Sequence, residues 1–478
     1  MNFKEALTYD DVLLVPRRSF IDHRGDIDIS TKLTKNISLK MPLISANMDS
    51  VTESEMAIAM ARMGGLGVIH RFMTVERQVA EVVRVKRSEG FVVDNPYTIS
   101  VDATLKMVWA MTEETGVHSF VVLDEQGIVV GLVTKQQTMF ETDSETRVKD
   151  IMVKGKDLIL AKPTIGFKQA KEIFKKHKIT KLPLVDGRNR LKGLITARSV
   201  MNNENFPDST KDERGRYMVG AAVGVVGDFM ERSDALVKVG CNVLVVDIAH
   251  GHNAVAIRAI KKIKKKFPKI DVVGGNVATA EGTLDLIVAG ADAVKVGIGP
   301  GGLCTTRIVA GVGVPQLSAV MESAKVAKKY GVPIIADGGA NYPGDMVKAL
   351  AGGASTCMLA GWFAGTDESP GGIIMRKGLK YKAHRGSASF MANADRKLAL
   401  EKGMTENKLN SIVAEGVEAV IPYKGAVGDV IFQLKGSIRS GMSYCNAKNI
   451  QALWKNAQFV KISSAGFRES KSHNVQEV

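Results

Sequence analysis

Short apolar segments recur along most of the chain, and amphipathic segments separate them. Near the N-terminus, residues 41–46 (Met-Pro-Leu-Ile-Ser-Ala) predict a buried strand, and residues 55–60 carry apolar residues at helical spacing. A second strand is predicted at Leu66–Ile69. The order strand, helix, strand indicates a parallel α/β arrangement.

The same alternation resumes after residues 202–208. Apolar runs that predict strands lie at residues 243–246, 272–275, 293–296, 333–336 and 357–360. Nearly every run is followed by Asp, Asn, Gly or a loop with a cysteine. A (β/α)8 barrel needs such residues at the carboxyl ends of successive strands, because its reactions occur there. An open doubly wound sheet would give similar runs, so the pattern alone leaves both α/β folds open.

Between about residues 91 and 206 the pattern is different and repeats itself. A β-rich segment at 116–123 leads to Gly131–Thr134, and the same order recurs at 178–185 and 193–196. Each unit pairs a helical segment with a hairpin around a polar turn. We therefore expect a tandem repeat, about 91–145 and 147–204, inserted into an α/β domain formed by residues 1–90 and 207–478.

Composition sets the broad class of the protein. The chain has 478 residues, of which 45% are hydrophobic, enough for a large core and at least two domains. No apolar run reaches the length of a membrane span, and the first residues lack the apolar core of a signal peptide. We expect a cytoplasmic protein without a membrane partner. The cysteines show no paired spacing that would indicate disulfides or a zinc site: Cys241, Cys304, Cys357 and Cys445.

The formal charge of +15 could attract nucleic acid or phosphorylated metabolites. Its densest cluster, residues 261–266, follows an apolar-periodic segment. Lysines there suit the solvated face and C-terminal end of an amphipathic helix. No aromatic interleaving or recognition motif accompanies the cluster, so no specific nucleic-acid partner is predicted.

The most informative stretch for chemistry is the glycine-rich loop Gly297–Arg307, which directly follows the strand predicted at 293–296. Its glycines let backbone amides approach an anion closely. A thiol among such N–H groups and near Arg307 could act as a nucleophile with a lowered pKa. A tight turn with a small buried cysteine explains the same residues, and the loop alone leaves both interpretations open.

This loop, Gly-Ile-Gly-Pro-Gly-Gly-Leu-Cys-Thr-Thr-Arg, resembles the catalytic cysteine loop of the IMP dehydrogenase/GMP reductase family. The segments at 7–12 (Leu-Thr-Tyr-Asp-Asp-Val), 47–53 (Asn-Met-Asp-Ser-Val-Thr-Glu) and 440–444 (Ser-Gly-Met-Ser-Tyr) extend the resemblance over nearly the whole chain. The resemblance implies a (β/α)8 TIM barrel with the repeat inserted between its early strands, and a homotetramer or homo-octamer. Gly302 stands where the family usually has a serine that helps to bind the nucleotide phosphate.

The resemblance also implies roles for individual residues. Cys304 is the expected nucleophile, Thr306 and Glu415 the acid/base pair, and residues 385–415 the mobile flap. A purine nucleotide monophosphate would be bound by Met48, Gly302, Asp337, Gly339, Ala360, Gly361 and Ser387. The nicotinamide cofactor would be bound by Asp247, Ile248, Ala249, Asn276 and Gly297. Backbone oxygens of Gly299, Gly301 and Cys304 match the family's potassium site.

Two aspartates illustrate how these roles rest on chemistry. Asp337 ends a predicted strand, and its carboxylate suits the two ribose hydroxyls of the nucleotide. Asp247 ends another and matches a contact to the ribose of the cofactor. No Gly-x-Gly-x-x-Gly fingerprint with its downstream acid is present, so a Rossmann mode of cofactor binding is not supported. His250 and His252 lack a partner that would complete a metal ligand set, and we expect loop histidines.

The tandem repeat resembles a pair of CBS motifs, a module that often binds adenosine or guanosine nucleotides and regulates its host. In that module an aspartate commonly follows the threonine by three positions to hold the ribose. Here those positions are Gln137 and Ser199. The repeat could therefore bind a nucleotide or serve a structural or assembly role.

The resemblance covers two reactions that share a covalent thioimidate on the cysteine. IMP dehydrogenase oxidises IMP to XMP with NAD and hydrolyses the adduct, using an Arg-Tyr pair in the flap to activate water. GMP reductase expels ammonia from GMP and uses NADPH to give IMP. In this chain the flap reads Asn-Ala-Asp-Arg-Lys-Leu at 393–398, without that pair. Reductase-like features also include Gln316–Val320, Pro343–Asp345, Gly361 and Gly386–Ser389.

The CBS repeat, Pro422–Gly425 and the length of the flap look like the dehydrogenase instead, and Arg396 could still activate water. We favour the reductase with NADPH and keep the dehydrogenase with NAD as the alternative. A third interpretation is a catalytically weak nucleotide sensor. Retention of Cys304, Thr306, Asp337 and Glu415 argues against it, because a binding module needs neither a thiol nor an acid/base pair.

Overall fold

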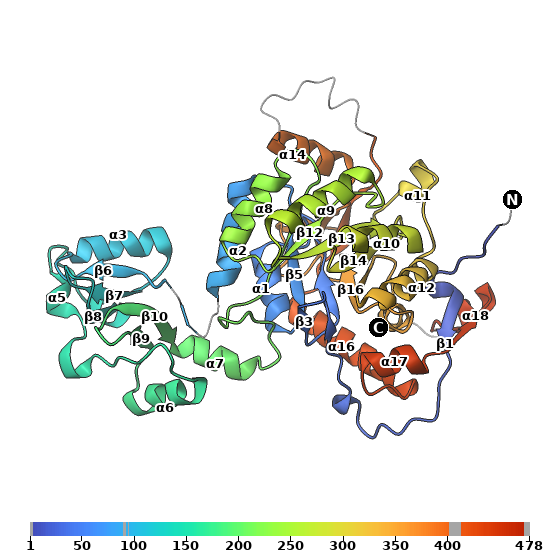
Figure 1. The fold of residues 1–478 in the computed structure, drawn as a ribbon. Helices are drawn as coiled ribbons and strands as arrows, with labels where there is room; N and C mark the ends of the chain where they lie inside the picture. The colour runs from blue at the N-terminus through green and yellow to red at the C-terminus, as the bar shows by residue number, and fades with distance from the viewer. Residues whose placement is uncertain (1–2, 89–91, 94, 401–412, 473–478) are drawn as a thin grey trace. The chain divides into compact units, whose positions relative to one another are not determined.

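The computed structural model describes residues 3–88, 92–93, 95–400 and 413–472, and for 202–203 and 396–400 it describes the backbone only. The chain divides into two compact units (Figure 1). One comprises Met1–Lys86, Asp208–Thr210 and Tyr217–Val478, and the other comprises Arg87–Pro207 and Lys211–Arg216. The repeat expected at 91–206 lies inside the second unit.

The first unit is built on a closed barrel of eight parallel strands, which confirms the (β/α)8 expectation over the open sheet. The order around the barrel is β11-β12-β13-β14-β15-β16-β4-β5. The bounds are β4 (Leu43–Ser45), β5 (Leu66–Ile69), β11 (Gly220–Val223), β12 (Val243–Val246), β13 (Asp271–Val277), β14 (Ala293–Val296), β15 (Ile334–Asp337) and β16 (Thr356–Leu359).

The strands are apolar along both faces because each face packs against a different core. Val243 and Val245 of β12 join the cluster inside the barrel, whereas Leu244 and Val246 join the outer cluster under the helices. Side chains alternate across a strand, so a strand with two buried faces reads as a continuous apolar run. This double burial explains why the barrel strands were visible in the sequence.

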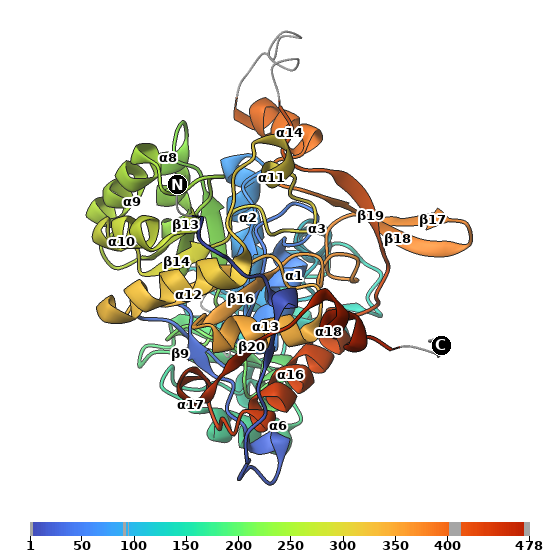
Figure 2. The same ribbon diagram turned by 90° about the vertical axis from the view of Figure 1, so that its right-hand side faces the viewer.

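Helices surround the barrel (Figure 2). They are α1 (Ser54–Arg62), α2 (Val75–Ser88), α8 (Phe229–Lys238), α9 (Ala254–Lys266), α10 (Ala280–Val288), α12 (Gln316–Ala327), α13 (Pro343–Ala351) and α16 (Val427–Tyr444). Helix α1 packs directly on β5: a Cβ at Gly67 would lie 2.5 Å from the Cα of Ala57, so only glycine fits there. Lysines at the end of α9 lie in its last turn, as expected from the charge cluster.

A small hairpin closes the N-terminal end of the barrel. Strands β2 (Thr31–Lys32) and β3 (Ser38–Leu39) pair, and Leu33, Ile37 and Leu39 join the inner apolar cluster. Thr34 and Asn36 donate hydrogen bonds to the carboxylate of Asp271, the first residue of β13. The opposite, C-terminal end of the barrel is therefore the end at which a site can open.

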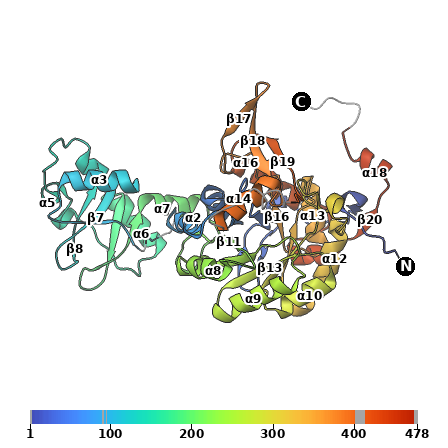
Figure 3. The same cartoon turned by 90° about the horizontal axis from the view of Figure 1, so that it is seen from above.

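A three-stranded antiparallel sheet projects from the barrel (Figure 3). Its strands are β17 (Ile373–Arg376), β18 (Leu379–Arg385) and β19 (Glu418–Pro422), and α14 (Phe390–Leu400) follows β18. Part of the segment expected as the flap, 401–412, lies outside the described residues. The remaining elements of this unit are η1 (Tyr9–Asp11), β1 (Val12–Leu14), η2 (Arg24–Asp26), α11 (Thr306–Val309), η4 (Lys328–Tyr330), α17 (Ile450–Asn456), β20 (Phe459–Lys461) and α18 (Ser464–Glu469).

The second unit contains two similar halves. The first has β6 (Thr98–Ser100), α3 (Leu105–Thr115), β7 (Ser119–Leu123), β8 (Val129–Thr134), α4 (Lys135–Thr138) and α5 (Val148–Ile151). The second has η3 (Gly155–Asp157), α6 (Phe167–His177), β9 (Lys181–Val185), β10 (Leu191–Thr196) and α7 (Ala197–Asn205). Each half has its own apolar cluster. Among the described helices of the whole chain, none combines the length and apolarity needed to cross a membrane.

Candidate active site

Many of the residues predicted to form the site lie where barrel strands end. Met48 follows β4, Asp247, Ile248 and Ala249 follow β12, and Gly297 follows β14. Asp337 is the last residue of β15, Gly339 comes two residues later, and Ala360 and Gly361 follow β16. Asn276 lies near the end of β13, and Ser387 lies in the turn after β18. These carboxyl ends meet on one face of a (β/α)8 barrel.

The thiol of Cys304 lies at the start of a chain of hydrogen-bonding groups. Its Sγ is 3.1 Å from Thr306 Oγ1, and Thr306 Oγ1 donates to Glu415 Oε2 at 2.8 Å. A threonine hydroxyl has a single hydrogen, so the bond to Glu415 leaves Thr306 as the acceptor from the thiol. The three groups form a path along which a proton can pass from sulfur to carboxylate and back.

Backbone pairing holds Glu415 over the cysteine loop. Thr305 N donates to Glu415 O at 2.9 Å, and Val417 N donates to Leu303 O at 3.0 Å. These two bonds flank the isolated antiparallel bridge between Cys304 and Gly416. Residues 415–417 therefore lie on the cysteine loop as a short added strand, which fixes where the carboxylate of Glu415 points.

Arg307 supports the backbone of the loop. Its Nη2 donates to Val314 O at 2.5 Å, and its Nε and Nη2 lie 3.4 Å from Ile298 O. These contacts give Arg307 a role in supporting the backbone of the loop. Gly299 has a φ of +79° and packs on the Arg307 side chain, where a Cβ would be 2.6 Å from Cγ. Glycine is required there by both conformation and space.

Asp337 belongs to a polar cluster at the ends of β13, β14 and β15. Lys295 Nζ lies 2.6 Å from Asp337 Oδ2, and Asn276 Nδ2 donates to the same oxygen at 2.9 Å. Asn276 Nδ2 also donates to Gly297 O at 2.8 Å. Lys295 is buried, so this ion pair is held in a low-dielectric setting. One carboxylate oxygen of Asp337 is thus occupied, and the other remains available to a ligand.

Asp247 is paired with a cation that the sequence analysis did not identify. Arg71, just after β5, donates from Nε to Asp247 Oδ2 at 2.9 Å and from Nη2 to Asp247 O at 3.1 Å. Burial would raise the pKa of Asp247, but the charges of Arg71 and Lys295 outweigh burial and lower it. Asp247 is therefore an anion at neutral pH and can accept hydrogen bonds.

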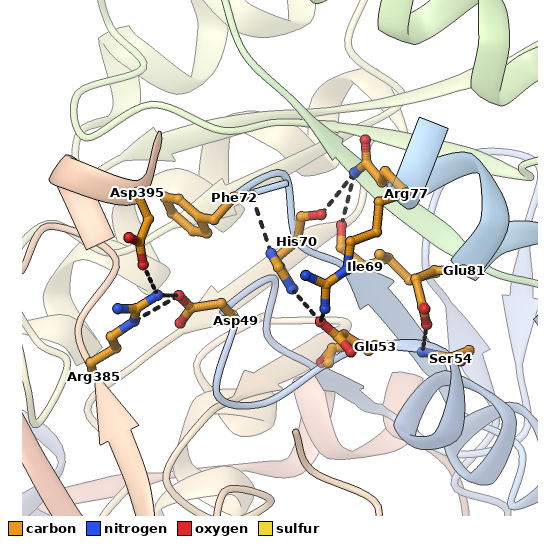
Figure 4. A network of polar contacts seen from close by, with 12 residues as sticks. Asp49, Glu53, Ser54, Ile69, His70, Phe72, Arg77, Glu81, Arg385 and Asp395 are labelled. Atoms are coloured by element: carbon orange, nitrogen blue, oxygen red, sulfur yellow. Dashed lines mark hydrogen bonds and ion pairs between the residues drawn. The ribbon is translucent and has the colours of Figure 1, made fainter. Parts of the chain in front are cut away.

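The loop that carries Met48 is tied to the last residue of β18, Arg385 (Figure 4). Arg385 Nε donates to Asp49 Oδ2 at 2.7 Å, and Arg385 Nη2 lies 2.6 Å from Asp395 Oδ2 on α14. The two carboxylates raise the pKa of Arg385, although burial alone would lower it. A second cluster in Figure 4 joins His70 Nε2 to Glu53 Oε1 at 3.2 Å.

Two glycines border open space at the expected phosphate position. A Cβ added to Gly302 or Gly361 would meet nothing within 4 Å, and neither glycine has a positive φ. The absence of a side chain at these positions is therefore not demanded by packing. At Gly302 the chain lacks the serine hydroxyl that the family usually has at this position.

Three carbonyl groups were expected to bind potassium, and carbonyl oxygens are suitable ligands for that ion. Gly301 O accepts a hydrogen bond from Cys304 N at 3.0 Å, whereas Gly299 O and Cys304 O accept none from the described residues. The loop therefore has two carbonyls free to ligate and a third that is shared.

For divalent metals, the described residues contain no group of three His, Cys, Asp or Glu side chains that could hold an ion. His252 instead pairs with Asp285 at 3.0 Å.

Comparison with known proteins agrees with this geometry. The model of the IMP dehydrogenase/GMP reductase domain matches residues 6–473. An inosine-5'-monophosphate dehydrogenase from Nitrosopumilus maritimus is 50% identical, with 99% of each chain covered. Its counterpart from Aquifex aeolicus is 48% identical, covering 99% of this chain and 96% of that protein.

Among solved structures, a cysteine-to-alanine variant of GMP reductase from Trypanosoma brucei, in complex with guanosine 5'-monophosphate, has a TM-score of 0.92. It is 39% identical, and the match covers 99% of both chains. The family match, the barrel and the cysteine loop lead to one conclusion. This chain belongs to the IMP dehydrogenase/GMP reductase family of NAD(P)-dependent purine nucleotide oxidoreductases.

Proposed function

We propose that the protein is a GMP reductase, which converts GMP, NADPH and two protons into IMP, NADP⁺ and an ammonium ion. The observation that carries the proposal is the path from Cys304 through Thr306 to Glu415, combined with a flap that lacks the Arg-Tyr pair. Expulsion of ammonia needs a proton donor beside the thioimidate carbon, and this path supplies one. The expulsion of ammonia does not by itself require a base that activates water.

The steps follow from the positions of the protons. The thiol proton moves to Thr306 Oγ1 while Thr306 passes its own to Glu415, and Sγ attacks carbon 2 of the purine. The same path then returns a proton to the amino group, which leaves as ammonia and leaves a thioimidate on Cys304. NADPH, when bound, supplies the hydride that takes the place of the amino group at carbon 2. Cleavage of the carbon–sulfur bond regenerates the cysteine.

The cofactor and substrate would be held by the strand ends already described. Asp247, Ile248, Ala249, Asn276 and Gly297 are proposed to bind the cofactor, and the anionic Asp247 is suited to ribose hydroxyls. Asp337, with Met48, Gly302, Gly339, Ala360, Gly361 and Ser387, is proposed to bind the nucleotide. Potassium at Gly299, Gly301 and Cys304 would stabilise the cysteine loop.

IMP dehydrogenase is the second candidate, because relatives that carry this name are 44–50% identical over nearly the whole chain. NAD would then accept the hydride from carbon 2 of IMP as the thioimidate forms on Cys304, and water would hydrolyse the thioimidate to XMP. That reaction needs a base, and Arg396 on α14 is the residue proposed for it. Lys397 would normally be protonated at neutral pH and is a poor base.

One pair of assays separates the candidates. The protein is incubated with GMP and NADPH, and separately with IMP and NAD, while the reduced cofactor, ammonia and XMP are measured. A reductase oxidises NADPH and releases ammonia in step with it. Multiple turnovers of XMP formation without ammonia release from GMP would reject the reductase and assign the dehydrogenase.

The inserted unit is proposed to act in assembly or regulation. Gln137 Oε1 accepts from Thr134 N at 3.1 Å, and Ser199 Oγ accepts from Thr196 N at 3.2 Å, so both side chains fold back on the preceding threonine. These are capping contacts and not a free carboxylate for a ribose. A homotetramer or homo-octamer is the proposed assembly, and an adenosine or guanosine nucleotide is the ligand to test at the repeat.

A further inference from the structure

Lys424 reaches from the segment after β19 to the turn that follows β16. Its Nζ donates to Gly361 O and, at 3.3 Å, to Trp362 O. Backbone bonds hold the same two segments together: Lys424 N donates to Gly365 O, and Asp367 N donates to Gly425 O, both at 2.9 Å. These contacts hold the ammonium at the turn that contains the backbone amides of Ala360 and Gly361.

The charge of this ammonium is not neutralised by the carboxylates around it. Tyr423 OH donates to Asp367 Oδ1 at 2.6 Å, and Val427 N donates to Glu368 Oε2 at 2.8 Å, so both nearby acids have other partners. Within the described part of the chain Lys424 forms no ion pair. Burial lowers the pKa of Lys424, which is the expected effect on a cation that lacks an anion.

Open space and a neutral neighbour adjoin the same place. Gly361 is exposed, and a Cβ there would meet nothing within 4 Å. His384 is buried on β18 with Nδ1 2.9 Å from Ser50 Oγ, and burial together with the charge of Lys424 lowers its pKa to about 4. At neutral pH His384 therefore adds no second cation, and Lys424 is the cation beside the turn.

We propose that the Lys424 ammonium is the electrostatic ligand of the substrate's 5'-phosphate and determines the preference for nucleotides over nucleosides. A phosphate monoester carries a charge close to −2, and Gly302 offers it no hydroxyl, so an unpaired ammonium is its strongest available partner. The bonds to Gly361 and Trp362 hold the ammonium beside the amides that would complete the phosphate site. The inference rests on the proposed nucleotide substrate, but it is the same for GMP and IMP.

The test compares binding of GMP with binding of guanosine by calorimetry, in the Cys304→Ala background to prevent turnover. Lys424→Gln is expected to weaken GMP binding at least tenfold and guanosine binding less than twofold. Lys424→Arg, which keeps the charge, is expected to restore most of the GMP affinity. Equal losses for GMP and guanosine, or no loss for GMP, would overturn the inference and leave Lys424 as a turn-stabilising residue.

Lys382 provides a matched control. Lys382 is buried, whereas Lys424 is half-buried, and the Nζ of Lys382 likewise donates to backbone carbonyls of a nearby turn, Thr366 O at 2.9 Å and Ser369 O at 2.6 Å. Lys382→Gln is expected to lower the thermal midpoint without changing the ratio of GMP to guanosine affinity. A change of that ratio equal to the one in Lys424→Gln would show that any buried lysine here has the effect, and would reject the assignment.

A second pair of variants covers the case in which Lys424→Gln does not fold. Gly361→Asp places a carboxylate in open space beside the ammonium, and Gly361→Asn has the same shape without the charge. The Asp variant is expected to lose GMP affinity at least tenfold relative to the Asn variant, while guanosine binds both equally. Equal GMP affinity would overturn the inference. If neither GMP nor IMP binds the unaltered protein, the proposed function itself fails.

Discussion

Thr306 and Glu415 are 109 residues apart in the chain, and their side chains meet at 2.8 Å. The contact brings an acid from the segment after α14 to a hydroxyl that already touches the thiol of Cys304. It is the relationship on which proton transfer at this site depends.

Glu415→Gln keeps the hydrogen-bonding shape but removes the group that can exchange a proton. We expect kcat to fall by about 10²- to 10⁴-fold, with little change in KM, because the lost function is proton transfer. Rapid-quench measurement of ammonia release checks this expectation. Glu55→Gln, at an exposed position on α1, serves as the control. A kcat within threefold of the unaltered protein would remove Glu415 from the mechanism.

The four thiols of the chain should differ sharply in reactivity. Burial raises the pKa of Cys241 to about 11 and that of Cys357 to about 12, and it also raises the pKa of Cys445. Cys304 is only half-buried. We expect one equivalent of iodoacetamide to react at pH 8, at Cys304, and mass spectrometry of peptides to locate it.

Cys304→Ala should take up no reagent under those conditions. Its activation free energy for turnover should rise by about 6 kcal/mol or more, since the covalent step is lost. Nucleotide binding should persist. Turnover within tenfold of the unaltered protein would contradict the role of Cys304.

Asp337 should affect both stability and binding, because it is the partner of buried Lys295. Asp337→Ala leaves that ammonium without its carboxylate, and we expect the free energy of unfolding to fall by about 3 kcal/mol. Denaturant titration measures the loss. Asp337→Ala combined with Lys295→Met should recover much of the stability but not the nucleotide affinity. Equal stability of Asp337→Ala and the unaltered protein would show that the ion pair contributes nothing.

The lowered pKa of His384 predicts that the protein loses stability in acid. Burial, with the charge of Lys424, lowers its pKa to about 4, below the unfolded value of about 6.5. Between these values the unfolded state binds more protons, so stability falls as the pH drops through this window. At pH 4.5 the contribution is about 2–3 kcal/mol. His384→Asn should therefore lose less stability than the unaltered protein between pH 7 and 4.5, as measured by thermal unfolding.

Residues 91–206 should be dispensable for chemistry. The inserted unit has apolar clusters of its own, and the flanking barrel strands β5 and β11 pair directly with each other. A short linker in place of 91–206 should leave kcat within about threefold, because each unit is expected to fold on its own core. A folded variant that binds nucleotide but does not turn over would show that the insertion contributes to the site.

The sequence predicted the barrel well for a physical reason. The apolar runs at 66–69 and 243–246 coincide with β5 and β12, since strands buried on both faces leave an uninterrupted apolar signal. The sheet of β17, β18 and β19 left no such signal, because all of β17 and much of the rest are exposed. Helix α14 was predicted only as part of a polar flap.

The site was predicted through motifs, and its supporting contacts were not. Lys295 was assigned to a strand and given no partner, although a lysine within an apolar run is a sign of a buried ion pair. Arg71 had no comparable sign, since its partner Asp247 is 176 residues away. Lys295 and Asp337 lie on the neighbouring strands β14 and β15, whereas Arg71 and Asp247 follow β5 and β12, which β11 separates. No local pattern of residues records either pair.

The hairpin of β2 and β3 gives the barrel a single entrance. With Leu33, Ile37 and Leu39 filling its N-terminal end, only the C-terminal end remains open, so both reactants and all three products of the proposed reaction would use the end near Glu415. When all ligands bind and leave through one opening, binding and release are ordered. The molecule that lies deeper must bind first and be released last. Steady-state kinetics of this enzyme should therefore be sequential and ordered, and the last product to leave should compete with the first substrate to enter.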